Sequence, residues 1–154
     1  MAKRGSDKMT VVDTLQAAYA KQDLSEERKN FLKAFFDEKK DLTKITKDEV
    51  ENFFSILREI TDKVALINST FPSDLELSFT RLEEFWRGLS RLDLSQLNGE
   101  IRFLFLSHLA FHRESIADII SEARALLIEE RRGFLKRLVQ YHKEFNNWFK
   151  QIEK

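Results

Sequence analysis

The chain has 154 residues, about the size of one domain, and its 26 basic and 26 acidic residues give a formal net charge of zero. It contains no cysteine, which excludes disulfides, thiolate metal sites and a cysteine nucleophile. No apolar run approaches the roughly 20 residues of a membrane span, so we expect a soluble chain with no membrane span. The lack of cysteine fits a reducing compartment, and we expect a cytoplasmic location.

The composition favours helices over strands. Four glycines and one proline are too few for the turns of a β-rich domain, and strong helix formers dominate. Phenylalanine, at 14 residues, is unusually common, so rings should fill the core. The sequence predicts an all-α, single-domain bundle of five or six mostly antiparallel helices, with one or two long C-terminal helices. Residues 1–9 are expected to be a disordered basic arm without the apolar segment of a secretory signal, and residues 10–154 the bundle domain.

The first two predicted helices are short. An apolar face from Val11 to Tyr19 predicts the first, which ends near Asp23. Ser25 is the expected N-cap of the second because two glutamates follow it and suit the positive end of a helix. That helix should end in the charged run 37–41.

The next two helices begin at predicted capping boxes. Thr46 and Glu49 form the first, and Ser73 and Glu76, directly after Pro72, form the second. After the first box, apolar residues recur every three or four positions, which predicts one buried stripe over five turns. Its members are Val50, Phe53, Leu57, Ile60, Val64 and Ile67.

Residues 100–111 are apolar on every side of a helix, with eight apolar residues among the twelve. Such a helix is either central in the bundle or covered by a partner. The apolar pattern continues to Leu126, which predicts a helix of about 30 residues. Gly133 either ends this helix or lies inside a longer one.

A heptad-like seam follows Gly133. Its apolar residues recur at spacings of four and three, which is typical of a helix that packs along a partner. We expect this seam to be the interaction surface. It consists of Phe134, Leu138, Tyr141, Phe145, Trp148 and Ile152.

The same C-terminal segment is basic, with seven basic and two acidic residues in 131–154. It could therefore contact nucleic acid. The residues expected to do so are Arg131, Arg132, Lys136, Arg137, His142 and Lys143. Arg137 and His142 have the Arg-x4-His spacing that resembles the signature of HEPN-type ribonucleases, which are helical and dimeric. The resemblance implies that the arginine steadies a phosphate and the histidine performs acid–base chemistry. It covers two residues, and Leu138 replaces the polar residue usual after the arginine.

His108 and His112 are four residues apart, so both could face one metal ion. A third ligand would be needed, and His142 is the remaining histidine of the sequence. If the chain reverses at Gly133, residue 142 lies beside residue 124, on the order of 18 Å from His112. We therefore expect a hydrogen-bonded, partly buried histidine pair, with no metal and no cofactor.

No glycine-rich phosphate loop, serine elbow or facing pair of carboxylates occurs in the sequence, so we do not expect an enzyme. The sequence predicts a non-catalytic interaction or scaffold protein that self-associates or serves as a small subunit of a larger assembly. The alternative is a small nucleic-acid-binding subunit or HEPN-like ribonuclease that uses the basic C-terminal helix.

Overall fold

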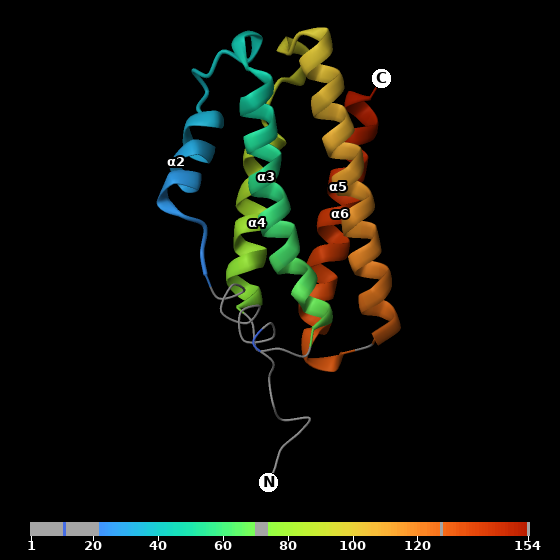
Figure 1. Cartoon of the computed structure of the whole chain (residues 1–154). Helices are drawn as coiled ribbons and strands as arrows, with labels where there is room; N and C mark the ends of the chain where they lie inside the picture. Colours follow the sequence, from blue (N-terminus) through green and yellow to red (C-terminus); the bar gives the residue numbers. More distant parts are fainter. Residues whose placement is uncertain (1–10, 12–21, 70–73, 127, 154) are drawn as a thin grey trace.

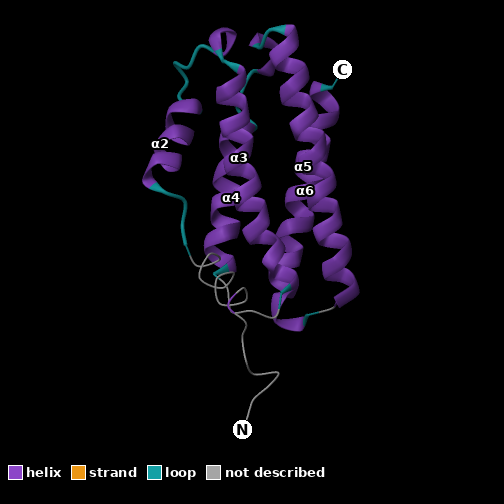
Figure 2. Cartoon of the chain, viewed as in Figure 1, coloured by secondary structure: helices purple, strands orange, loops and turns teal. Residues whose placement is uncertain are grey.

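The structure is a computed structural model that describes Val11 and residues 22–69, 74–126 and 128–153. No strand occurs among these residues, and their five α-helices confirm the predicted all-α fold (Figures 1 and 2). The helices are α2 (Glu26–Phe35), α3 (Lys47–Val64), α4 (Leu75–Leu89), α5 (Gly99–Leu126) and α6 (Arg132–Ile152). Short 3₁₀ turns lie between them: η2 (Leu42–Lys44), η3 (Ala65–Asn68), η4 (Leu94–Gln96) and η5 (Glu129–Arg131). The predicted basic arm lies outside the described residues, as does the predicted first helix apart from Val11 and its expected end near Asp23, where residues 22–25 are not helical.

The four longer helices form two hairpins that pack side by side. Helix α3 packs against α4 and α5 packs against α6, while α3 also contacts α5 and α4 contacts α6. The chain runs down α3, up α4, down α5 and up α6, so α3 and α5 are parallel neighbours on one face (Figure 1). Helix α2 packs against the outer side of α3. No described helix is long and apolar enough to cross a membrane.

Local capping signals set the helix starts. Ser25 accepts a hydrogen bond from the backbone N–H of Arg28, and Thr46 and Glu49 form the predicted capping box. At α4 the N-cap is Asp74, whose carboxylate accepts from the N–H of Leu77. The predicted cap Ser73 lies outside the described residues.

The chain reverses before Gly133. Helix α5 ends at Leu126, and Gly133 is the second residue of α6. The turn is fixed from a distance by Arg131, whose Nη1 lies within 2.6–2.9 Å of three backbone carbonyl oxygens in and just after η3. A bond between the two hairpins, rather than the glycine, therefore positions the start of α6.

Rings fill the core, as the phenylalanine content predicts. Phe53 stacks on Phe35 with a centroid distance of 4.2 Å and also contacts Phe85 and Phe105. These contacts join α2, α3, α4 and α5. A second group of rings joins α4 and α6, consisting of Trp86, Tyr141, Phe145 and Trp148.

Candidate functional site

The structure places the predicted interaction seam of α6 inside the chain's own core. Leu138, Tyr141 and Phe145 are buried, and their solvent-exposed fractions are 0 %, 5 % and 1 %. Phe134, Trp148 and Ile152 are partly buried and pack against the same core. Helices α4 and α5 therefore occupy the seam, and a partner of the folded chain would have to bind elsewhere.

Three of the basic residues predicted to contact nucleic acid are engaged within the chain. Arg131 binds the carbonyl oxygens of η3, and Arg132 lies 2.6 Å from a carboxylate oxygen of Glu129. Two nitrogens of the Arg137 guanidinium donate hydrogen bonds to the carboxylate of Glu83, and the third donates to that of Glu76. Lys136 and Lys143 are exposed on α6.

The Arg-x4-His pair points in two directions. Arg137 faces α4, where its guanidinium also lies over the rings of Phe79 and Phe134. His142 faces α5 and lies close to Arg113. Burial and the Arg113 charge lower the pKa of His142. The described chain does not bring the two side chains together on one phosphate-sized site.

The two histidines of α5 do not pair with each other. His108 stacks on Phe54 with a centroid distance of 4.6 Å, and its Nε2 lies 3.4 Å from Glu51. His112 bonds instead to Tyr141, at 2.6 Å from Nε2 to the hydroxyl oxygen. Of the two histidines expected to be hydrogen-bonded and partly buried, His112 is buried and hydrogen-bonded, and His108 is partly buried against Phe54. The expected distance from His112 to residue 142 is wrong, because the earlier turn brings this part of α6 alongside His112. Among the described residues, no group of three or more His, Asp or Glu could hold a metal ion.

His112 belongs to a buried chain of hydrogen bonds that links α6, α5 and α3. The Thr61 hydroxyl donates to the carbonyl of Leu57 at 2.7 Å, so its oxygen can accept from His112 Nδ1–H at 3.5 Å. Nε2 then accepts from the Tyr141 hydroxyl. Burial, with a smaller effect from His142, lowers the pKa of His112 to about 3, and burial raises the pKa of Tyr141. Both groups are therefore neutral at physiological pH.

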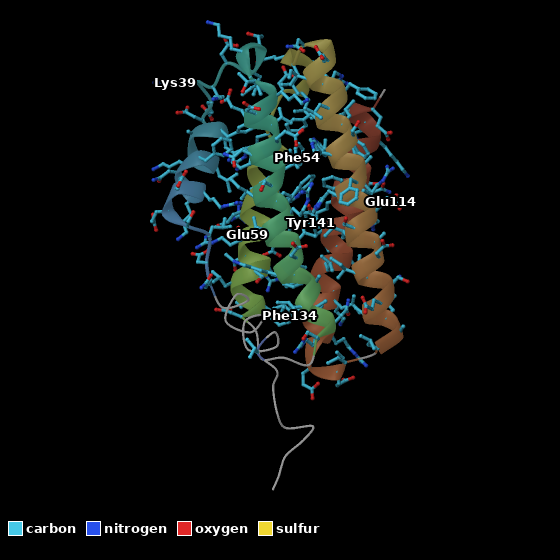
Figure 3. All side chains as sticks on the ribbon, in the orientation of Figure 1. Lys39, Phe54, Glu59, Glu114, Phe134 and Tyr141 are labelled. Carbon is cyan, nitrogen blue, oxygen red and sulfur yellow. The ribbon has the colours of Figure 1, made fainter. Side chains whose placement is uncertain are left out.

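A groove of about 360 Å³ lies between α3 and α5, directly above this chain of hydrogen bonds. Figure 3 labels Phe54 on α3 and also Tyr141 of α6, which is seen in this view between α3 and α5. The α3 side contributes Phe54, Leu57, Arg58, Thr61, Asp62 and Ala65. The α5 side contributes His108, Phe111, His112, Ser115, Asp118 and Ile119. This size and mixture of apolar walls with a few polar groups are typical of a binding site.

Carboxylates mark the lower part of the groove. Asp62 lies on the α3 wall and Asp118 on the α5 wall. Partial burial raises the pKa of Asp62, and this effect exceeds the opposite one of the Arg58 charge. A group that displaced more water from the groove would raise the pKa of Asp62 further.

Two phenylalanines of α5 are exposed, and one of them, Phe111, lines the groove. Phe103 and Phe111, both on α5, leave 75 % and 63 % of their surface in solvent. They alternate with Ser107 and Ser115 at intervals of four residues, so the four side chains form one row, inclined to the helix axis, along the outer surface of α5. We call this row the α5 stripe. Buried residues such as Leu109 and Ile116 occupy the opposite face of α5.

Comparison with protein-family models, with curated proteins and with solved structures found no match. The function is therefore inferred from the described geometry.

The groove and the α5 stripe were not among the predicted site residues. A signal for them was present, because residues 100–111 are apolar on every side and one explanation was a covering partner. The periodicity could not show which rings of α5 point outward, since α5 packs against helices from two separate hairpins.

Proposed function

We propose that this chain is a non-catalytic interaction protein that self-associates through the outer face of α3 and α5. The observation that supports the proposal is the pair of exposed rings on α5, Phe103 and Phe111, of which Phe111 lines an apolar groove. Isolated exposed apolar residues are common, but rings aligned on one helix next to a groove are typical of an interaction surface.

A second copy of the chain is the occupant that suits the α5 stripe best. The stripe presents large and small side chains in alternation, so one surface offers both projections and the recesses that receive them. A C₂ pair buries the same patch on both partners and therefore requires this kind of self-complementarity. Buried His112 supports a structural role, because both of its ring nitrogens face groups of the same chain.

The contribution of the exposed rings to the free energy of association can be estimated. Full burial of a phenylalanine side chain is worth about 1.5–3 kcal/mol, so four largely exposed rings in a pair of chains offer about 4–8 kcal/mol. Association costs are of similar size. The rings alone would therefore support weak association, and further contacts in the groove are needed for a stable pair.

Sedimentation velocity tests the proposal directly. Intact protein should pass from monomer to dimer between about 1 μM and about 200 μM, a range that brackets a micromolar dissociation constant. The double variant F103S/F111S, which places serine at all four stripe positions, should remain monomeric. Its urea midpoint should stay near that of the parent, because both rings are exposed.

Leu126→Ser is the matched control. Leu126 is also an exposed apolar residue of α5, 50 % accessible, but it lies eleven residues beyond Ser115, about 16 Å along the helix. It should leave dimerisation unchanged. A parent protein that stays monomeric throughout, or a double variant that dimerises like its parent, would refute the proposal.

A further inference from the structure

The serines of the α5 stripe are shallow recesses rather than polar projections. Ser107 donates its hydroxyl to the carbonyl of Phe103 at 2.9 Å, and Ser115 donates to that of Phe111 at 3.1 Å. Each hydroxyl is thereby satisfied four residues back on the same helix. A ring packed over either serine would therefore not bury a polar group without a hydrogen-bond partner.

The order of rings and recesses distinguishes between two orientations of a second copy. In a parallel two-fold pair each residue of α5 faces itself, so ring meets ring and the serine recesses stay empty. In an antiparallel pair with its axis midway between Ser107 and Phe111, Phe111 faces Ser107 and Phe103 faces Ser115. This register places all four rings of the pair over serines, as close packing requires.

We infer that two copies pair antiparallel about a two-fold axis between Ser107 and Phe111, with Phe103 of each copy seated at the α3–α5 groove of the other. The inference rests on the proposed self-association and specifies the partner and its orientation.

The groove can receive the ring. Ser115, which faces Phe103 of the second copy in this register, is on the α5 wall of the groove, next to Phe111 and Ile119. The groove measures about 360 Å³, whereas a cavity of about 150 Å³ is enough to hold benzene. Phe103 would thus bury its ring in an apolar recess, and the apolar groove residues that the ring covers would supply the further contact that a stable pair needs.

Charge at the ends of the α5 stripe makes the pairing sensitive to salt. In the antiparallel register Glu100 of one copy faces Asp118 of the other, and both residues are exposed. Salt screens repulsion between exposed like charges. The dimer dissociation constant should therefore fall about two- to fivefold between low and high salt, whereas binding of a basic partner to the same surface would weaken.

Single cysteines test the orientation cleanly because the natural chain has none. In the antiparallel pair the two Ser107 positions are offset by four residues, about 6 Å along the helix, and the two Ser115 positions by twelve, about 18 Å. In a parallel pair both offsets are zero. Full-length S107C and S115C, at dimer-forming concentration, are treated with the short cross-linker bis-maleimidoethane and compared by denaturing gel.

We expect S107C to cross-link at least tenfold faster than S115C. The S107C product should disappear when the substitutions F103S and F111S are made in the same chain. Equal cross-linking of both variants would overturn the antiparallel register while leaving self-association intact. A dimer in sedimentation without cross-linking of S107C would also overturn it. A monomer at every concentration and salt would refute self-association and this inference together.

Discussion

Lowering the pH should expose the energetic cost of burying His112 as a neutral ring. Its exposed fraction is 5 %, and burial, with a smaller effect from His142, lowers its pKa from 6.5 to about 3. In the unfolded chain the ring takes up a proton near its ordinary pKa, whereas in the folded chain it does not until the pH is near 3. The unfolded state binds more protons between these values, so stability is complete above pH 6.5 and falls as the pH is lowered through this window.

The size of the loss follows from linkage. At about pH 4.5 the unfolded ring is two pH units below its pKa, and each unit is worth about 1.4 kcal/mol, so we expect a loss of about 2–3 kcal/mol relative to about pH 7. This result holds for any native pKa of His112 below about 4, because the native ring is then still neutral at that pH. The prediction depends mainly on the ring staying buried and unprotonated.

The measurement compares urea unfolding of the parent and of His112→Gln at both pH values, in the F103S/F111S background so that association does not contribute. Trp86, whose ring centroid lies 5.9 Å from that of Tyr141, provides a fluorescence signal close to the substituted residue. Other titrating groups, such as His142 with its lowered pKa and Asp62 with its raised pKa, are common to both proteins. Their contributions cancel in the difference.

Tyr141→Phe is the matched control, because it removes the hydroxyl bonded to His112 but leaves the imidazole buried. It should lower stability by about 1–3 kcal/mol at both pH values and keep the pH dependence. If the parent and His112→Gln lost the same free energy between the two pH values, the idea of a buried neutral imidazole would be wrong.

Two further predictions concern the connections of the fold, and both are read from urea midpoints. Gly88→Ala should lower the free energy of unfolding by about 1–3 kcal/mol, because a Cβ there would lie 2.6 Å from the ring of Phe36. Gly133→Ala has open space at the Cβ position, so it should leave the free energy of unfolding unchanged or raise it by up to about 1 kcal/mol. Equal effects of the two substitutions would contradict this packing. Arg131→Ala should lower the free energy of unfolding by about 2 kcal/mol, because it leaves the carbonyl oxygens at η3 without their hydrogen-bond donor. A loss no larger than that caused by Lys136→Ala would show that this contact between the two hairpins is weak.

The sequence predicted the helices well where the determining interactions are local. All six residues of the stripe that starts at Val50 are at most 2 % exposed. The capping box at Thr46 is formed as predicted. Both signals involve residues within one or a few turns of each other, so neighbouring side chains settle the outcome.

The register of α5 against α6 could not be predicted in the same way. The glycine at position 133 suggested a turn, but Arg131 binds carbonyls more than 60 residues away and fixes the reversal before it. When the position of the turn is wrong by a few residues, the pairing of residues between the two helices of the hairpin is wrong by twice that number. That doubling explains why residue 142 was expected far from His112, when its neighbour Tyr141 bonds to that imidazole.

The misplaced interaction surface has a more general cause. An apolar stripe shows that a helix face is buried, but a face buried by the same chain and one buried by another chain have the same periodicity. The seam around Phe145 and the rings of α5 were equally good candidates by that measure. The two surfaces differ in whether the chain itself covers them: α4 and α5 cover the seam, whereas no described helix covers Phe103 and Phe111. An unmatched apolar face, found only after every described helix has been placed, is therefore a better indicator of a partner than apolar periodicity itself.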